Sequence, residues 1–320
     1  MNRVEKMGRK RILITGSTGM LGRSLVRNLQ DNINFELITP LRSELNLLSE
    51  DETLSFLKSE SPELIISTAA KVGGIGDNES NSYDFLIQNL KMQINLINGA
   101  HLSNIQDLIF IGSSCVYPGN ITEEIKEEML LSGPLEKTNE AYAVAKIAGV
   151  FQTKILQEKF KRNYFTVMPS NLYGPYDNFS VSTAHVLPAM IHKFHKARIN
   201  GESTVELWGD GSPKREFVYV DDISEAVALL IDFKPKEAML NLGAKYEISI
   251  KELSEVISEI VGFDGEVLWD NRKPNGTMRK RLDSSRMKTL GWEPKTELRD
   301  GIRQTYQWFK ENYDSETIRK

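Results

Sequence analysis

Short runs of apolar and β-branched residues alternate with segments of helical periodicity through the first half of the chain. The runs expected to form strands are Arg11–Thr15, Phe35–Thr39, Leu64–Thr68, Leu108–Gly112 and Tyr164–Met168. The segments with helical spacing between them are Leu21–Leu29, Ser49–Ser59, Asp84–Leu102 and Ala141–Phe160. Parallel strands need long crossovers, and strands covered on both faces are nearly all apolar. The pattern therefore predicts an α/β fold with a doubly wound parallel sheet.

The second half of the chain has a less regular pattern. Strands are expected at Val205–Trp208 and Phe217–Val220, and helices at His185–Ala197, Asp222–Asp232, Ile250–Val261 and Asp300–Tyr313. The change of pattern near Gly174 indicates a domain boundary. We expect an N-terminal domain over residues 1–174 and a smaller C-terminal domain over residues 175–320. A strand and a helix near residues 217–243 are expected to return to the first domain, so the boundary is discontinuous.

Composition excludes several classes of protein. The 320 residues are 40% apolar and 26% charged, which is ordinary for a globular protein. A formal net charge of −4 argues against a nucleic acid or a membrane surface as a partner. The longest apolar runs, such as Leu108–Ile111, are far too short to span a bilayer. The basic start, Met1–Lys10, has no apolar segment after it, so we expect a disordered leader and not a signal peptide.

Cys115 is the single cysteine of the chain. No internal disulfide can therefore form, and the reducing cytoplasm is the expected location. A lone cysteine is most often a small buried hydrophobic residue, which is its interpretation before its neighbours are considered. No metal site is expected.

A glycine-rich loop, Gly16–Gly22, separates the first strand from the first helix. Glycines permit a tight turn there and let the backbone approach a pyrophosphate, which the N–H groups of the helix N-terminus then face. The spacing is G-x-x-G-x-x-G and not the usual dinucleotide fingerprint, so an ordinary strand–turn–helix stays open. The loop predicts a Rossmann-type dinucleotide site over residues 1–174. Its candidate cofactor-binding residues are Gly16, Thr18, Gly19, Met20, Leu21 and Gly22.

The end of the second strand bears on the choice of cofactor. An acid at this position binds the ribose 2′-OH of NAD, whereas an arginine suits the 2′-phosphate of NADP. The strand runs into Thr39–Arg42, with no acid before Glu44. Arg42 is thus a candidate ligand of the 2′-phosphate of NADP(H), with a solvated surface arginine as the open alternative.

Candidate catalytic groups lie on a predicted helix and on the loop after a predicted strand. Tyr142 and Lys146 are four residues apart and share one helix face. The lysine would favour the phenolate and lower the pKa of Tyr142, making it a usable acid and base for a carbonyl oxygen. Ser113 follows an apolar strand, where a small hydroxyl side chain faces the ligand crevice and can donate to a ketone oxygen.

These residues resemble an extended short-chain dehydrogenase/reductase, and more narrowly the GDP-L-fucose synthase family. That family comprises epimerase–reductases that act on GDP-4-keto-6-deoxymannose. The segments that carry the resemblance are Ala69–Ile75, Gly112–Pro118, Thr138–Gly149, Met168–Pro175, Asp177–Phe179, His185–Pro188, Trp208–Gly211, Arg215–Phe217 and Lys273–Thr277. They spread over nearly the whole chain, so coincidence does not explain them.

The resemblance implies a role for each matching residue. Ser113, Tyr142 and Lys146 correspond to the reductase triad, and Cys115 and His185 to the base and acid of epimerisation. Ala69, Ala70, Tyr142, Lys146 and His185 join the glycine loop and Arg42 as cofactor-binding residues. The C-terminal domain is implied to bind the GDP-linked 4-keto-6-deoxy sugar. The residues implied to do so are Asn171, just before the boundary, and Lys193, Trp208, Arg215 and Lys280 within that domain.

Two departures from the family pattern leave the details open. Thr18 and Pro40 stand where members commonly carry arginines for NADP, which leaves the preference between NADPH and NADH undecided. The charged loop Gly119–Leu131 lacks the usual proline and lies near the sugar, so the substrate can be other than the ordinary deoxyhexose.

Besides an epimerase–reductase of a GDP-4-keto sugar, two other functions stay open. The first is a C4-reductase alone, acting on a GDP-4-keto-6-deoxy-heptose that another enzyme epimerises. The second, less favoured, is a non-catalytic nucleotide sensor, against which the intact triad argues. A dehydratase is disfavoured because Ser114 and Cys115 stand where it carries an Asp–Glu pair. The resemblance also implies a homodimer through a four-helix bundle of Asp84–Leu102 and Ala141–Phe160, although burial inside one subunit would explain the same apolar stripes.

Overall fold

The computed structural model describes residues 8–273, 275–315 and 318. The expected leader therefore lies outside the described residues over positions 1–7, as does Pro274 of the Lys273–Thr277 segment.

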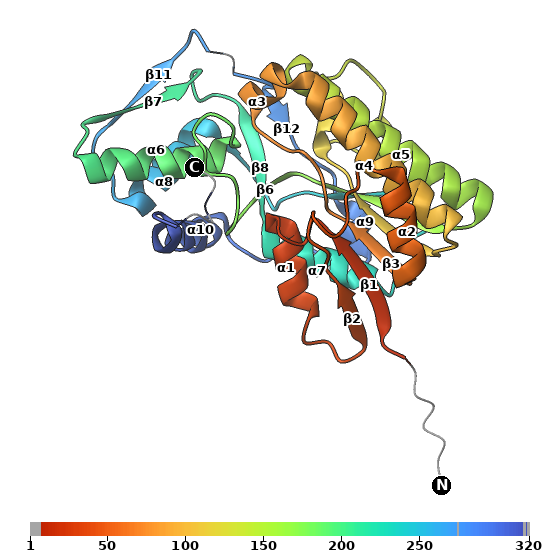
Figure 1. Ribbon diagram of the computed structural model, residues 1–320. Coiled ribbons are helices and arrows are strands. Elements are labelled where there is room, and N and C mark those ends of the chain that lie inside the picture. Colours follow the sequence, from red (N-terminus) through yellow and green to blue (C-terminus); the bar gives the residue numbers. More distant parts are fainter. Residues whose placement is uncertain (1–7, 274, 316–317, 319–320) are drawn as a thin grey trace.

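Six parallel strands form the central sheet, in the order β2-β1-β3-β4-β5-β9. Figure 1 shows β2, β1 and β3 of this sheet next to one another. Their bounds are β1 Lys10–Thr15, β2 Phe35–Ile38, β3 Leu64–Ser67, β4 Asp107–Ile111, β5 Asn163–Pro169 and β9 Met239–Leu242. Every neighbouring pair in the sheet is parallel. The predicted α/β fold with a doubly wound parallel sheet is confirmed, because helices also cover both of its faces.

Successive side chains of each strand point to opposite faces of the sheet, which explains why helices cover both faces. Ile12 and Ile14 of β1 pack in one cluster with residues of α1 (Met20–Leu29) and α7 (Val220–Leu230). Leu13, between them, points to the opposite face because side chains alternate along a strand. It packs there in a cluster with residues of α2 (Glu50–Glu60), α4 (Ser82–Leu102) and α5 (Glu140–Phe160). Burial on both faces leaves the carboxyl edge of the sheet for polar chemistry.

The strand order reverses at β1, which lies between β2 and β3. The chain leaves β1 in one direction to reach β2 and later returns to the other side of β1 as β3. The loops after β1 and β3 therefore diverge and leave a crevice outside the carboxyl ends of these strands. Open α/β sheets bind ligands at such a switch point.

The C-terminal part is built on a second, mixed sheet of β6 (Asn171–Tyr173), β8 (Lys214–Tyr219), β10 (Glu247–Ser249) and β12 (Arg279–Lys280). Two further strands, β7 (Thr204–Trp208) and β11 (Glu266–Asp270), pair in parallel. The helices of this part are α6 (Val186–Asn200), α8 (Ile250–Val261) and α10 (Leu298–Asn312), whose apolar faces share one core. The short helices α3 (Ile75–Ser80) and α9 (Ser285–Thr289) complete the set named in Figure 1.

One expected strand takes a different place in the fold. Phe217 and Val218 lie in β8, which pairs with β6, β10 and β12 and not with the central sheet. The strand that joins the central sheet is β9, which pairs with β5, and α7 packs against α1. The division at residue 174 stays a prediction.

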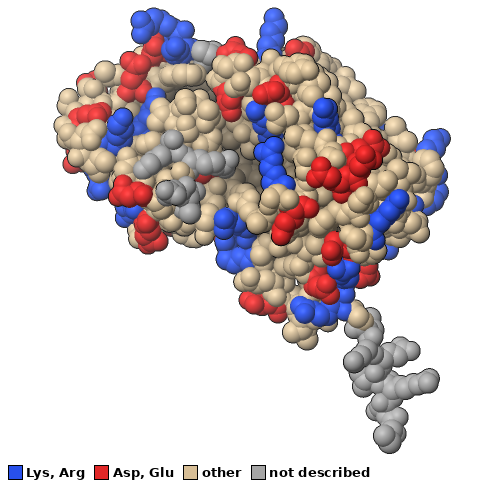
Figure 2. Space-filling view, viewed as in Figure 1, with Lys and Arg blue, Asp and Glu red and all other residues tan. Residues whose placement is uncertain are grey.

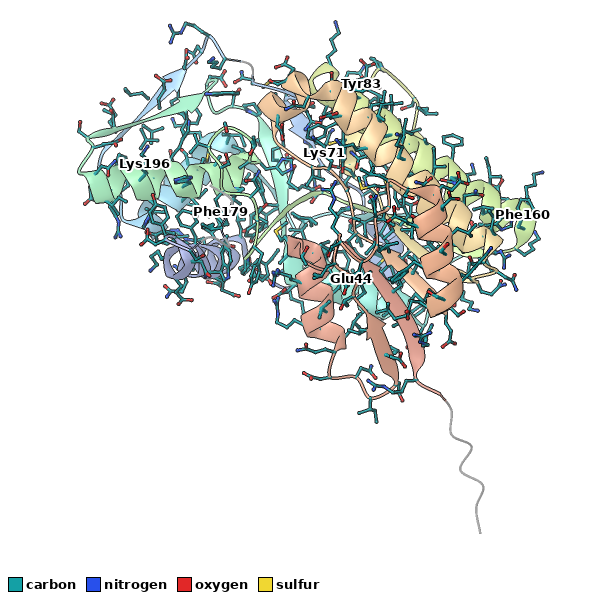
Figure 3. The ribbon with its side chains drawn as sticks, in the orientation of Figure 1. Glu44, Lys71, Tyr83, Phe160, Phe179 and Lys196 are labelled. Carbon is teal, nitrogen blue, oxygen red and sulfur yellow. The ribbon has the colours of Figure 1, made fainter. Side chains whose placement is uncertain are left out.

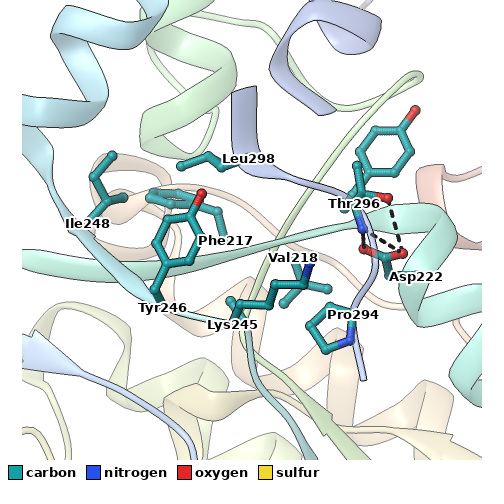
Figure 4. Close-up of a pocket in the computed structure, with 11 residues that line it drawn as sticks. Phe217, Val218, Asp222, Lys245, Tyr246, Ile248, Pro294, Thr296 and Leu298 are labelled. Carbon is teal, nitrogen blue, oxygen red and sulfur yellow. Dashed lines mark hydrogen bonds between the residues drawn. The ribbon is translucent and has the colours of Figure 1, made fainter. Parts of the chain in front are cut away.

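Asp222, at the start of α7, links that helix to the segment before α10. Its carboxylate accepts hydrogen bonds from the backbone N–H of Thr296 at 3.0 Å and from the hydroxyl of Thr296 at 3.1 Å (Figure 4). The pocket beside this contact, lined also by Phe217 and Lys245, has a volume of about 10 Å³. It has room for about one water molecule and no larger ligand.

Acidic and basic side chains are interspersed on the face shown in Figure 2. Among the described residues, no helix combines the length and the apolar character that crossing a membrane requires.

A buried carboxyl group joins β8 of the second sheet to the segments that follow β9 and β12. Glu216 of β8 has no exposed surface. It accepts hydrogen bonds from the backbone N–H groups of Ala244, after β9, at 3.2 Å and of Leu282, after β12, at 2.8 Å. Burial raises the pKa of Glu216 to about 8, and the two N–H donors offset only part of this rise.

We expect Glu216→Gln to change how stability depends on pH. Because the folded pKa lies near 8 and the ordinary value is 4.5, the folded protein keeps a proton that the unfolded chain releases in this window. The free energy of unfolding of the wild type should therefore fall relative to the variant as pH rises from about 5 to about 8, by up to about 1.4 kcal/mol per pH unit. Urea denaturation at several pH values measures this difference. Parallel stability curves for the two proteins would contradict it.

Candidate active site

A cavity of about 890 Å³ runs along the carboxyl edge of the central sheet and into the C-terminal part. It brings together every residue that the sequence selected. The lining includes Gly16, Thr18, Gly19, Met20, Leu21, Gly22, Arg42, Ala69, Ala70, Ser113, Cys115, Tyr142, Lys146, Asn171, His185, Lys193, Trp208, Arg215 and Lys280. Residues more than 260 positions apart thus share one cavity wall. The role of each residue stays a prediction.

The glycine loop is shaped for close backbone contact. Gly16 adopts a left-handed conformation with φ +69°, and a Cβ there would lie 2.8 Å from the backbone nitrogen of Ala69. A Cβ on Gly22 would overlap the carbonyl oxygen of Gly16. Gly19 is the N-cap of α1 and supplies no side-chain cap, so the N–H groups of the first turn remain for another acceptor. These features fit a pyrophosphate at the N-terminus of α1.

Arg42 lies beyond the end of β2, exposed and on the cavity wall. Among the described residues it has no hydrogen bond or ion pair, in contrast to Glu44, which accepts a hydrogen bond from the backbone N–H of Leu41 at 2.7 Å. The guanidinium is therefore available to an anion in this part of the cavity.

Ser113 stands directly after β4, at the start of a 3-10 turn over Ser114–Val116. Its hydroxyl oxygen accepts a hydrogen bond from the backbone N–H of Cys115 at 3.2 Å, which caps the turn. This turn carries both the serine and the cysteine into the cavity.

Tyr142 and Lys146 lie on α5 and are almost fully buried, with 9% and 3% of their surfaces exposed. The ammonium of Lys146 donates a hydrogen bond to the carbonyl of Ile111 at the end of β4, at 2.8 Å. Burial lowers the pKa of Lys146 to about 7.

Tyr142 does not have the low pKa that its spacing from Lys146 predicts. Burial raises the pKa of its phenol well above the ordinary value, and a negative charge on Cys115 adds to the rise, whereas a hydrogen bond with Ser113 opposes it. The ammonium of Lys146 is 5.8 Å from the centre of the Tyr142 ring and is directed to the backbone instead. The physical reason is that Tyr142 and Lys146 are both removed from water. The cost of desolvating a phenolate outweighs its attraction to the Lys146 ammonium, which is bonded to the carbonyl of Ile111.

Cys115 and His185 reach the cavity from different parts of the fold. The thiol of Cys115 is half-buried and accepts a hydrogen bond from the amide Nδ2 of Asn139 at 3.4 Å. His185 is the N-cap of α6, and its exposed surface lines the cavity. The protein packed around it lowers the pKa of its imidazole through desolvation.

The far end of the cavity carries cations and an aromatic ring. Arg215 of β8 and Lys280 of β12 are register partners, so their side chains emerge side by side. Burial lowers the pKa of Arg215. Lys193 donates to the carbonyl of Glu206 at 2.8 Å, and Asn171 donates to the carbonyl of Glu216 at 2.8 Å. Trp208 keeps 47% of its surface exposed.

Among the polar residues of this cavity that the sequence did not single out are Asn139 and Glu136. Glu136 accepts a hydrogen bond from the hydroxyl of Thr277 and lies close enough to Arg215 to affect its pKa. Asn139 falls within the Thr138–Gly149 segment that carried the resemblance, but it reads there as an ordinary helix start. Within the part of the chain that the structure describes, no cluster of three or more His, Cys, Asp or Glu residues could hold a metal ion.

A doubly wound sheet, a glycine loop at its switch point and a cavity across its carboxyl edge define the class of Rossmann-type dinucleotide-binding enzymes. The particular family follows from comparison with known sequences. The chain belongs to the NAD dependent epimerase/dehydratase family, whose profile matches residues 12–243.

Similar proteins cover almost the full chain. The sequence is 43% identical to GDP-L-fucose synthase 1 of Arabidopsis thaliana over 302 residues, 94% of each chain. A GDP-6-OMe-4-keto-L-xylo-heptose reductase from C. jejuni has a TM-score of 0.88 and 32% identity, over 95% of this chain and 98% of that one. A GDP-L-fucose synthetase from Naegleria fowleri, bound to NADP, has a TM-score of 0.88 and 28% identity, over 98% of both chains.

Proposed function

We propose that this protein is an NADP(H)-dependent enzyme that epimerises a GDP-4-keto-6-deoxy sugar at C3 and C5 and reduces it at C4, giving GDP-L-fucose or a related GDP-sugar. The observation that carries the proposal is the meeting of two sets of groups in one cavity. Ser113, Tyr142 and Lys146 suit carbonyl reduction, and Cys115 and His185 suit proton exchange beside a carbonyl. Full-length similarity to a GDP-L-fucose synthase supports the same substrate class.

The residues of the glycine loop fit the cofactor, which supplies the hydride for C4 when it is bound. The uncapped N-terminus of α1 would hold its pyrophosphate, and Arg42 its 2′-phosphate. Ala69 and Ala70, which follow β3, and Lys146 would border the remaining part of the cofactor.

For reduction, Tyr142 serves as the acid that protonates the C4 oxygen. Its raised pKa keeps the phenol protonated at neutral pH, which is the form that a proton donor needs. Ser113 donates a second hydrogen bond to the same oxygen as negative charge develops. Lys146, whose pKa is about 7, donates to the carbonyl of Ile111 and so holds this part of α5, with Tyr142, against the end of β4.

For epimerisation, the C4 ketone acidifies the protons on C3 and C5. Cys115 removes a proton from one face of the sugar, and the electrons of the broken C–H bond move into an enolate. His185 returns a proton to the other face, which inverts the carbon. Desolvation lowers the pKa of His185, but a substrate diphosphate and an enolate bring negative charge that favours the imidazolium.

The second candidate is a C4-reductase without epimerisation. The C. jejuni heptose reductase favours this possibility, since its fold matches with a TM-score of 0.88. The cavity lining contains no residue of the charged loop Gly119–Leu131, so this loop does not supply the room for a larger sugar that the sequence suggested.

The assembly is proposed to be a homodimer in the cytoplasm, with a four-helix bundle formed by α4 and α5 of each subunit. These two helices pack side by side at the edge of the molecule (Figure 1). Tyr83 and Phe160 mark the two ends of this edge in Figure 3. The exposed apolar residues along it are Tyr83, Ile94, Leu102, Val144, Phe151, Ile155 and Phe160. Several exposed apolar residues on two neighbouring helices are typical of an interface.

We expect Tyr142→Phe to lose hydride transfer by roughly 10²-fold or more, because one acid–base group contributes this much. Cofactor binding should stay nearly intact, since only a hydroxyl is removed. Single-turnover oxidation of NADPH with a GDP-4-keto sugar measures the rate, and a fluorescence titration measures binding. Turnover at the wild-type rate would contradict the role of Tyr142.

Cys115→Ser should separate the two reactions. A serine hydroxyl is a far weaker base than a thiolate, yet it preserves size and hydrogen bonding. We expect the variant to stop washing deuterium into C3 and C5 in deuterated water while it still reduces an already epimerised sugar. Exchange at the wild-type rate would show that Cys115 is not the base. If the wild type exchanges no deuterium, the protein is a C4-reductase that does not epimerise.

Arg42→Ala should lower kcat/KM for NADPH and leave that for NADH nearly unchanged. The guanidinium is the group available to a 2′-phosphate at the end of β2, which NADH lacks. The loss should be about tenfold or more, since a charge-assisted hydrogen bond contributes about 1.5–3 kcal/mol. Equal losses for both cofactors would instead indicate a general role in the cavity.

Phe151→Glu should convert the dimer into a monomer, because it places a charge within the exposed apolar face of α5. Sedimentation velocity measures the mass of both proteins. Ile33→Glu is the matched control, since Ile33 is 83% exposed and lies outside α4 and α5. A wild type that sediments as a monomer would contradict the proposed assembly.

A further inference from the structure

Asn139 occupies the N-cap position of α5 but does not cap the helix. An asparagine there normally accepts a hydrogen bond from a backbone N–H of the first turn. The side chain of Asn139 instead turns to the loop after β4, where its Nδ2 donates to the Sγ of Cys115 at 3.4 Å. A residue type suited to stabilise the helix start is thus used to contact the thiol.

The other end of the same amide has no partner. The Oδ1 of Asn139 is buried and unpaired within the described part of the chain. Buried polar atoms are nearly always paired, so this orientation of the amide is costly for the fold. Asn139 also lines the large cavity. A costly polar contact at a cavity wall is typical of a functional constraint and not of a packing one.

Ionisable groups face the thiol from the other elements of the site. Tyr142 of α5 and Arg215 of β8 are both close enough for a charge on Cys115 to change their pKa values. Glu136 lies beside Arg215, and His185 lines the same cavity. Under the proposed function Arg215 binds the substrate diphosphate, so its positive charge is divided between the diphosphate and the thiolate of Cys115. Asn139 is the neutral donor hydrogen-bonded directly to the sulfur.

We propose that Asn139 is a positioning residue for Cys115, whose N–H···S hydrogen bond holds the sulfur in the cavity and favours the thiolate. The role rests on the proposed function, in which this thiolate removes the proton from the sugar carbon. A donor that bonds more strongly to the charged form than to the neutral form shifts the equilibrium toward the charged form. The N–H group therefore increases the fraction of Cys115 ready to act as base.

The single cysteine allows a direct test. Alkylation by iodoacetamide reports on Cys115 alone, because the chain has no other thiol. Asn139→Asp keeps the shape of the side chain but replaces the donor with a carboxylate. We expect the midpoint of the pH dependence of alkylation to rise by about one pH unit or more, and by less in Asn139→Ala. Midpoints in both variants equal to that of the wild type would overturn the proposal.

Asn81→Ala is the matched control, since Asn81 is also an N-cap without a side-chain cap, at the start of α4. It lies outside the cavity lining, so its midpoint should equal that of the wild type. Circular dichroism checks that each variant folds. Where Asn139→Asp does not fold, Asn139→Ala carries the comparison, because it removes no cap and introduces no charge.

Deuterium exchange provides a second readout that a structural role would not move. In Asn139→Asp the pH profile of wash-in at C3 and C5 should shift to higher pH. An unshifted profile would overturn the proposal. A wild type without exchange would overturn the proposed epimerisation instead, whereas the alkylation midpoints still decide whether Asn139 favours the thiolate.

Discussion

The close packing of α5 against β4 is the constraint on which the site depends. Gly149 of α5 faces Phe110 of β4, and a Cβ at this glycine would lie 2.5 Å from a ring carbon of the phenylalanine. One turn earlier, Lys146 donates to the carbonyl of Ile111 at the end of the same strand. The helix therefore presents Tyr142 directly beside the turn that carries Ser113 and Cys115. A bulkier residue at position 149 would move the acid away from its partners.

Desolvation then sets the chemistry of the cavity. It raises the pKa of Tyr142 and lowers that of Lys146, His185 and Arg215. Each shift disfavours charge before a ligand is present, and an anion that enters the cavity favours the protonated form of all four groups. A nucleotide diphosphate and the oxyanion formed at a ketone both supply negative charge where these cations lie. The same physical effect thus supports substrate binding and proton transfer.

The features that the sequence pattern did not predict have a common physical origin. Val218 and Leu240 both lie in short strands that contain apolar residues, so periodicity could not tell which strand joins the central sheet. Pairing with β5 or with β6 depends on partners distant in the chain. Similarly, the spacing of Tyr142 and Lys146 indicated a shared helix face but not that the ammonium would be bonded to Ile111. Asn139 had no sequence signal, because its partner, Cys115, lies 24 residues away on another element.

The amino-acid sequence by itself determined the alternation of strands and helices, the parallel sheet, the glycine loop and the residue types of the candidate triad. These are local properties, since they follow from side-chain periodicity and from the backbone freedom of glycine. Only the tertiary structure decided that Arg215 and Lys280 are neighbours, that burial opposes the charge on Tyr142, and that Asn139 contacts the thiol. Strand register, desolvation and contacts between distant segments depend on how the whole chain packs, and no window of sequence contains them.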